Sequence, residues 1–343
     1  MYQAFRTFAF MATLQLSLIV PVYNRPDEVR ELLESLARQT DKDFELILVE
    51  DGSSIRAEAV AKTYADRVNL KYFYKENQGP AIGRNFGIEK ASGNYFIFVD
   101  SDCILPPQYV AEVKRYLREE FVDAFGGPDS ADESFSTLQK ATNYAMTSLL
   151  TTGGIRGKKK RIDRFYPRSF NMGISQAVVD KLGGFPVVRL HPGEDMIFSI
   201  QIVQAGFGTA LFPEAFVYHK RRTSLGKFYR QVYKFGFVRV IISQLYPETF
   251  KLFYAAPTVF LLGHLLLLGA SLRMPFLLGL PLLYAGLVFF HALLTEKNIS
   301  VAVLAILTSY TQLFGYGMGF LRASLNKYLG LQGDVRRYLE RPV

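Results

Sequence analysis

The chain has 343 residues, of which 49% are hydrophobic and 21% charged, and its formal net charge is +9 at pH 7. This length suffices for one substantial domain and a smaller part. Its one cysteine, Cys103, excludes an intrachain disulfide framework and fits a cytosolic catalytic domain. The positive charge suits either nucleic acid or an anionic membrane surface.

The first part of the chain alternates predicted strands and helices. Residues 1–14 are interpreted as an N-terminal extension, because this segment is too short to span a membrane and has only one basic residue before Ala12. Predicted strands follow at residues 16–20, 44–49, 70–74 and 95–99, the first ending at Pro21. The helix after the first strand carries one apolar stripe, formed by Val29, Leu32, Leu33 and Leu36. This order predicts an α/β fold with a doubly wound, mostly parallel sheet.

Polar residues follow the predicted strand ends. Tyr23, Asp51 and Asp100 each come just after a strand, so we expect them along one edge of the sheet. In Asp100-Ser-Asp102, two carboxylates could share a hard divalent cation with a diphosphate. Taken alone, this motif is more typical of a plain turn than of a cation site. Ser53 or Ser54 is predicted to cap the next helix.

Four motifs in order are similar to those of family-2 glycosyltransferases with the GT-A fold, over residues 15–225. They are Pro21-Val-Tyr-Asn24, Glu50-Asp-Gly-Ser53, Asp100-Ser-Asp102 and Gly193-Glu-Asp195. The resemblance implies a nucleotide-sugar donor whose base contacts Pro21, Tyr23 and Asp51. It implies that Arg84 approaches the diphosphate. Asp100 would contact the ribose or a metal-bound water, and Asp102 would bind Mg2+ or Mn2+.

The resemblance also assigns the acceptor side. Asp195 would be the catalytic base and Glu194 a supporting residue, although an acidic pair at a helix start can simply cap the helix. The spacing of His219 and Arg222 matches a metal ligand followed by a phosphate contact, although a lone histidine after an apolar strand is more often structural. Residues 171–175 and 183–185 fit an acceptor-side loop and turn, or are turn glycines.

A glycine-rich stretch, residues 153–157, precedes the basic run Lys158-Lys-Lys-Arg161. It is interpreted as a loop that either cradles a lipid phosphate or is solvated.

The last third of the chain is predicted to enter a membrane. Residues 252–272, 274–295 and 298–321 contain no Asp, Glu, Lys or Arg; Arg273, Glu296 and Lys297 lie in the connections between them. Each run has about the 20 residues needed to cross a bilayer, which predicts three transmembrane helices; a buried all-helical core is the alternative. A membrane partner therefore accounts for the positive charge better than nucleic acid does.

Residues 225–250 are predicted to form an amphipathic interfacial segment. Its apolar residues recur at helical spacing, with Lys227, Arg230, Lys234 and Arg239 between them. Such a helix would lie in the headgroup layer or, equally, pack on the catalytic domain.

The predicted topology contains a conflict. Three crossings would place the tail opposite a cytosolic catalytic domain, yet its basic residues favour the cytosolic side. These residues are Arg322, Lys327, Arg336, Arg337 and Arg341. A re-entrant segment is an alternative, with Pro257 or the 273–275 connection as the irregular place.

The expected domains are an extension, a catalytic domain, an interfacial segment, transmembrane helices and a basic tail, at residues 1–14, 15–224, 225–250, 251–322 and 323–343. The expected function is metal-dependent, inverting transfer of a single sugar from a nucleotide-sugar donor to a lipid or lipid-linked acceptor, on the cytosolic face of a membrane, in glycolipid or cell-envelope polysaccharide synthesis. One alternative is a processive polysaccharide synthase, which would carry Gln-x-x-Arg-Trp where this chain has Gln231-Val-Tyr-Lys-Phe235 and contains no Trp. The other is a non-catalytic membrane scaffold.

Overall fold

A computed structural model describes residues 14–152, 165–331 and 333–340. The predicted extension, apart from its last residue, and the basic loop at 153–161 lie outside these residues. The chain divides into two compact units. Unit 1 comprises residues 1–130, 158–187 and 194–219, and unit 2 comprises residues 131–157, 188–193 and 220–343. The predicted domain boundaries stay predictions, since unit 2 also takes in residues far before 225.

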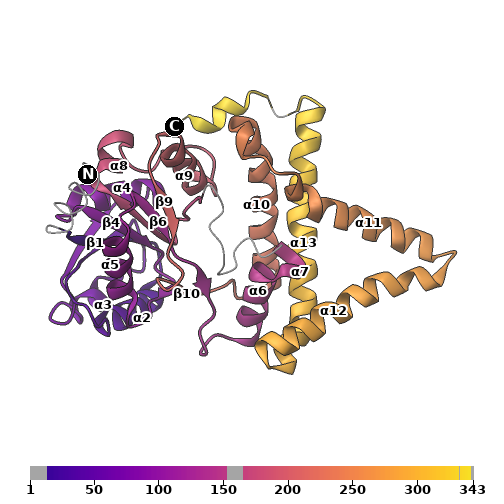
Figure 1. Cartoon of the computed structure of the whole chain (residues 1–343), viewed down its shortest axis with the longest axis horizontal. Coiled ribbons are helices and arrows are strands. Elements are labelled where there is room, and N and C mark those ends of the chain that lie inside the picture. The colour runs from indigo at the N-terminus through magenta and orange to yellow at the C-terminus, as the bar shows by residue number, and fades with distance from the viewer. Residues whose placement is uncertain (1–13, 153–164, 332, 341–343) are drawn as a thin grey trace. The chain divides into compact units, whose positions relative to one another are not determined.

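Unit 1 is built on a seven-stranded sheet of order β3-β2-β1-β4-β8-β6-β9 (Figure 1). Its four parallel strands are β1 (Leu16–Val22), β2 (Glu45–Asp51), β3 (Leu70–Lys75) and β4 (Tyr95–Val99). The others are β8 (Asn171–Ser175), antiparallel to β4 and β6 (Ala124–Gly126), and β9 (Thr209–Leu211), parallel to β6. The predicted doubly wound, mostly parallel sheet is confirmed.

Helices cover both faces of this sheet because its strands are apolar on both sides. On one face lie α2 (Pro26–Ala37), α3 (Glu58–Lys62) and α5 (Tyr109–Glu119). On the other lie α4 (Pro80–Lys90), α8 (Gln176–Leu182) and α9 (Glu194–Gln204). Within β1, Leu18 and Val20 join the first core while Ile19 joins the second. The predicted apolar stripe of α2 is fully buried.

The first strand differs from the prediction in its end. It does not stop at Pro21 but runs through it to Val22, with Pro21 opposite Val49 of β2. Pairing of β1 with β4 ends at Ile19. Proline has no N–H to donate, and Pro21 lies beyond the last residue that β4 pairs with, so no hydrogen bond to β4 is lost there.

Two local predictions are wrong. Neither Ser53 nor Ser54 caps α3, because this helix begins only at Glu58. Both hydroxyls instead bond to Asn24. Ser53 Oγ accepts from the Asn24 backbone N at 2.7 Å, and Ser54 Oγ donates to Asn24 Oδ1. Residues 171–175 are not a loop but the buried strand β8. A Cβ at Gly173 would lie 2.0 Å from the Phe125 ring, so this glycine is required by packing. Gly183 and Gly184 do form a turn, with φ of 75° and 97°.

A second, three-stranded sheet lies in unit 1. It contains β5 (Cys103–Ile104), β10 (Val217–His219) and β7 (Asp129–Ser130). β5 and β10 are antiparallel, and His219 is the register partner of Cys103. This pairing brings a residue from the end of unit 1 beside the Asp100-Ser-Asp102 motif.

Unit 2 is helical. Its α-helices are α6 (Thr137–Thr147), α7 (Leu149–Thr152), α10 (Leu225–Leu245), α11 (Ala256–Ser271), α12 (Gly279–Glu296) and α13 (Ile299–Tyr328). Short 3-10 helices are η1 (Pro247–Thr249), η2 (Leu252–Ala255), η3 (Pro275–Leu278) and η4 (Val335–Leu339). Three segments are long and apolar enough to cross a membrane: Leu252–Ser271, Pro275–Glu296 and Ile299–Tyr328.

The apolar face of α10 packs on α13 through glycines. A Cβ at Gly236 would lie 2.0 Å from the Tyr316 carbonyl oxygen, and a Cβ at Gly319 would lie 2.0 Å from the Tyr233 carbonyl oxygen. The two backbones therefore touch, as in small-residue helix pairs. The predicted helix is confirmed, but its apolar face is covered by α13, a partner that its own pattern could not indicate.

Substituting Gly319 by alanine is expected to destabilise unit 2, because the new methyl group collides with backbone rather than with a movable side chain. Overpacking of this kind typically costs 1–3 kcal/mol. Gly263→Ala is the matched control, since nothing lies within 4 Å of its added Cβ. Thermal unfolding in detergent should show a lower Tm for Gly319→Ala alone; equal Tm values would contradict the close packing.

Glu45 stabilises unit 1 at the end of the sheet opposite the predicted site. Its carboxylate accepts hydrogen bonds from Ser17 Oγ at 2.6 Å, Ser92 Oγ at 2.7 Å and Lys71 Nζ at 2.8 Å. Burial alone would raise the pKa of Glu45, but these partners lower it from 4.5 to about 2. The stabilisation is therefore complete above about pH 4.5 and is lost as the pH falls towards 2.

Substituting Glu45 by glutamine should lower the free energy of unfolding by about 3 kcal/mol at pH 7, the equivalent of this pKa shift. Near pH 3 the difference should shrink. Denaturant unfolding of wild type and variant at both pH values checks this. Glu58→Gln, which alters an exposed pair, is the control and should change stability little. A difference that is the same at both pH values would contradict the assignment.

Candidate active site

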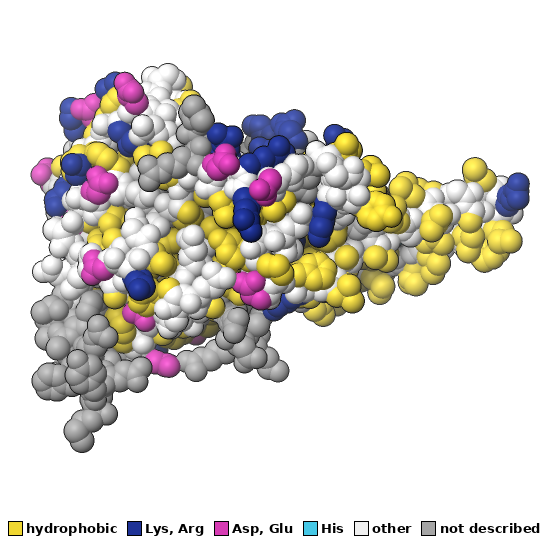
Figure 2. Space-filling model, turned by 90° about the horizontal axis from the view of Figure 1, so that it is seen from above, with side chains coloured by type: hydrophobic (Ala, Val, Ile, Leu, Met, Phe, Trp, Pro, Cys, Tyr) yellow, Lys and Arg dark blue, Asp and Glu magenta, His cyan; other side chains and the backbone are white. Residues whose placement is uncertain are grey.

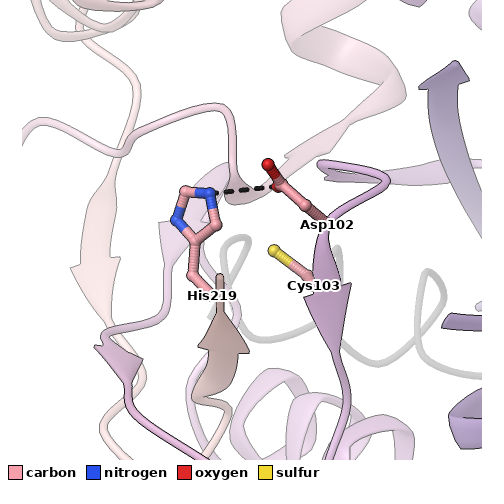
Figure 3. A group of neighbouring side chains, drawn as sticks. All are labelled: Asp102, Cys103 and His219. Atoms are coloured by element: carbon pink, nitrogen blue, oxygen red, sulfur yellow. Dashed lines mark ion pairs between the residues drawn. The ribbon is translucent and has the colours of Figure 1, made fainter. Parts of the chain in front are cut away.

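Asp102, His219 and Cys103 form a cluster at the carboxyl edge of the parallel strands. Figure 3 shows Asp102 and His219 pointing toward one another, with the Cys103 sulfur beside them. His219 Nε2 lies 3.1 Å from Asp102 Oδ1, and one ligand atom from each of the three residues lies within 4.8 Å of the others. Arg25, just past β1, donates a hydrogen bond to Asp102 Oδ2. The cluster thus joins the ends of three strands.

The charges around Asp102 keep it ionised. Burial alone would raise its pKa, but His219 and then Arg25 lower it, and the net pKa lies below the ordinary value. Burial, followed by the charges of Asp102 and Asp100, raises the pKa of the Cys103 thiol well above its usual value. At neutral pH, Asp102 is therefore a carboxylate and Cys103 a protonated thiol.

The donor set fits a divalent cation on Asp102 and His219. Among the described residues, Asp102 Oδ1 has no hydrogen-bond partner although His219 Nε2 lies 3.1 Å from it, so these two atoms are the ones available to share a cation. A carboxylate with an imidazole is a ligand pair that Mn2+ accepts, whereas a thiol such as that of Cys103 suits softer ions. The His219 ring stacks on Phe170, with ring centres 5.1 Å apart, which fixes its plane.

Asp100, Arg84 and Glu194 form a second row at this edge. Arg84, on α4, is 4% exposed; its Nη2 donates to Asp100 Oδ1 at 2.8 Å, and its Nη1 lies 3.9 Å from Glu194 Oε1. Within the part of the chain that the structure describes, Arg84 Nε and Nη1 have no hydrogen-bond partner. A buried cation with spare donors is suited to an anionic ligand.

Asp195 faces a different partner from its neighbour. Both acidic residues are in the first turn of α9, but Asp195 Oδ2 accepts from Arg168 Nε at 2.9 Å and Oδ1 accepts from the Met196 backbone N at 2.8 Å. Asp195 thus accepts from one of the free N–H groups in the first turn of α9, and this contact does not conflict with a second role. The structure separates Glu194, beside Arg84, from Asp195, beside Arg168.

Asp51 holds a loop together at the end of β2. It accepts hydrogen bonds from Lys75 Nζ at 2.6 Å, the Gln78 backbone N at 3.1 Å and the Gly79 backbone N at 2.9 Å. Tyr23, at the end of β1, is 53% exposed. Pro21 lies in β1 beside Gly83 of α4. The residues predicted for nucleobase binding thus lie at the ends of neighbouring strands. Asp51 is already hydrogen-bonded to Lys75 and Pro21 lies against α4, whereas Tyr23 is exposed.

Arg222 does not belong to unit 1. It is exposed in unit 2, while the preceding Arg221 is buried and donates from Nη2 to Asn143 Oδ1 on α6 at 2.9 Å. Three cations were missed by the sequence analysis: Arg25, Arg168 and Lys75. Only Arg25 carried a signal, because it directly follows the motif at residues 21–24.

Comparisons with known proteins point to glycosyltransferases. Residues 17–183 match the model of glycosyl transferase family 2. The putative glycosyltransferase EpsH of Bacillus subtilis is 40% identical over 32% of this chain and 32% of its own length. The uncharacterized glycosyltransferase YibD of Escherichia coli is 40% identical over 42% of each chain. The chain spans less than half the length of these relatives.

Two solved structures share the fold. TarS 1-349 of S. aureus has a TM-score of 0.50 at 18% identity and covers 92% of both chains. The mannosyltransferase PcManGT of Pyrobaculum calidifontis, in complex with GDP-Man and Mn2+, has a TM-score of 0.54 at 16% identity and covers 95% of this chain and 94% of its own. The sheet is of the GT-A type, and the segment of the chain that matches glycosyl transferase family 2 is residues 17–183.

Proposed function

We propose that the chain is a membrane-anchored, inverting glycosyltransferase that moves a single sugar from a nucleotide-sugar donor to a lipid or lipid-linked acceptor. The observation that carries the proposal is the gathering, at one sheet edge, of a carboxylate–imidazole pair, a buried arginine with spare donors and an acidic helix start. Its relatives are named glycosyltransferases, and one protein of the same fold binds GDP-Man with Mn2+.

The donor would lie across the ends of β1, β2 and β4. Tyr23, Pro21 and Asp51 would contact the nucleobase, with the exposed Tyr23 ring available for stacking. Asp100 would contact the ribose, and Arg84 would offer its unpaired nitrogens to the diphosphate. The role of Arg222 as a phosphate contact stays a prediction.

Mg2+ or Mn2+ would be held by Asp102 and His219. When bound, such an ion offsets the negative charge that develops on the departing diphosphate. Arg25 competes for the same Asp102 carboxylate. It would therefore keep Asp102 ionised and oriented before the donor arrives.

Asp195 would accept the proton of the acceptor hydroxyl. The hydroxyl oxygen forms a bond to the anomeric carbon as the bond from that carbon to the diphosphate oxygen breaks, and the hydroxyl proton passes to Asp195. Direct displacement inverts the anomeric configuration. Arg168 and the Met196 N–H hold the carboxylate in place, and Glu194 would support Arg84.

The candidate spans support a lipid acceptor. Apolar segments within unit 2 would keep the enzyme on a membrane, where such an acceptor is available. We place unit 1 on the cytosolic side, where nucleotide sugars are made and where one free cysteine is normal.

The proposal is tested with protein in lipid vesicles, a panel of nucleotide sugars, Mn2+ or Mg2+, and a lipid extract. We expect one donor to release its nucleoside diphosphate and to transfer one sugar to the lipid phase, and excess chelator to stop both. Asp195→Asn in the same vesicles is the control for contaminating activity. Long sugar chains would indicate a processive synthase, and no donor consumption under any condition would leave a scaffold.

A further inference from the structure

The helix α13 packs on one side against α6 and α10, two helices that carry charged residues. Thr308 Oγ1 donates to the Ala141 carbonyl of α6 at 2.8 Å, and Gly315 and Gly319 contact the α10 backbone or side chains. The most apolar stretch of α13 is 44% buried, against 17% and 11% for the other two candidate spans. Of the three apolar segments, α13 is thus the one most covered by protein.

The partner of α13 cannot follow it into a bilayer. On α10, Lys227, Arg230 and Lys234 are exposed, interspersed with the residues that contact α13. The helices run side by side in the same direction, because Val232 lies at Gly315 and Phe237 at Gly319. A crossing by this part of α13 would draw the cations of α10 into hydrocarbon, where charged side chains are strongly disfavoured.

The helices α11 and α12 have the opposite character. Most of their leucines are exposed, and between residues 252 and 295 Arg273 is the one Asp, Glu, Lys or Arg. One end of each helix contacts α13. Gly317 O accepts a hydrogen bond from Thr258 of α11, and Val288 and Ala292 of α12 pack with Ala302 and Ala305 of α13. Figure 1 shows α11 and α12 converging away from α13, and Figure 2 shows hydrophobic side chains on the surface of these two helices.

The C-terminal tail is paired to a residue that precedes all three apolar segments. The Arg189 backbone N donates to the Tyr338 carbonyl at 3.1 Å and lies 3.2 Å from that of Glu340, while Arg189 Nη1 lies 3.8 Å from Glu340 Oε2. An odd number of crossings would separate these residues by a hydrocarbon core of about 30 Å. The pairing therefore requires an even number.

We propose that the membrane is entered only by the hairpin of α11 and α12, while α10, α13 and the tail stay on the face from which the hairpin enters. This inference rests on the membrane attachment in the proposed function. In this arrangement the hydrocarbon of the bilayer covers the exposed leucine side chains of α11 and α12. The basic residues Lys251 and Lys297 flank the hairpin at that face, as expected beside anionic lipid. The topology conflict in the sequence is thereby removed, because the basic tail returns to the side of α10.

Single cysteines test this topology. Lys251→Cys lies before the hairpin, Arg336→Cys in the tail and Lys62→Cys on an exposed helix of unit 1, and all three positions are exposed. Wild type is the control for background, since its one cysteine is buried. A membrane-impermeant maleimide is applied to right-side-out and inverted vesicles, and Lys62→Cys reports the integrity of each preparation.

We expect Lys251→Cys and Arg336→Cys to be labelled in the same vesicle orientation as Lys62→Cys. Labelling of Arg336→Cys only in the opposite orientation, or only after the vesicles are dissolved, would overturn the hairpin topology. Release of the wild type from the vesicles by an alkaline wash would instead refute the membrane attachment itself, so the two failures are distinguishable.

Discussion

Substituting Asp102 by asparagine is expected to abolish turnover while the protein stays folded. The change removes the charge that pairs with Arg25 and His219 and would hold the cation, but it alters little volume. Loss of a residue that merely supports a metal ligand typically costs 10–100-fold in metal affinity or activity. Loss of the ligand itself should therefore lower turnover by more than roughly 100-fold.

The measurement is the initial rate of nucleoside diphosphate release across a Mn2+ titration, with the Tm of each protein alongside. Asp66→Asn, at an exposed position of unit 1, is the matched control and should behave as wild type. Near wild-type turnover for Asp102→Asn, or full activity of the parent in chelator, would refute the metal site.

Substituting Asp195 by asparagine should lower sugar transfer by roughly 10² to 10⁴-fold, the usual contribution of a positioned proton acceptor. The amide keeps an oxygen for the Met196 N–H, so α9 should remain stable. Donor binding should survive because Asp195 lies beside Arg168 and not in the row of Arg84 and Asp100.

Donor binding and sugar transfer, measured side by side, separate a base from a structural residue. Asp195→Asn should bind the donor as wild type does but transfer its sugar far more slowly. Arg168→Lys, which keeps the charge but changes its geometry, should transfer at an intermediate rate. Transfer at the wild-type rate by Asp195→Asn would mean that this residue only caps α9.

The sequence predicted the parts of the fold that depend on local pattern. The apolar stripe of α2 and strands β2 to β4 follow from spacing alone, and together they place Asp51 and Asp100 at one edge. Strand β8 was missed because its glycine, asparagine and serine are typical of turns. Only the Phe125 ring, 48 residues earlier in the chain than Gly173, explains why a strand forms there.

Contacts between residues distant in the chain could not be predicted from the sequence either. Arg25 and Asp102 are 77 residues apart, and Arg168 and Asp195 are 27 apart, so no local spacing connects them. The face of α10 was predictable from its period, but its partner α13 was not, because both an interfacial and a packed helix share that period. The pairing of the tail with Arg189 is likewise visible only in three dimensions.

Calorimetric titration measures whether this sheet edge binds a nucleoside diphosphate through a divalent cation. Purified protein is titrated with a panel of nucleoside diphosphates, with Mn2+ or with chelator, in parallel with Asp102→Asn. We expect one nucleoside diphosphate to bind with Mn2+, and its binding to be lost or greatly weakened in chelator and in the variant. Binding that is unchanged by chelator and by the substitution, or no binding of any member of the panel, would contradict this expectation.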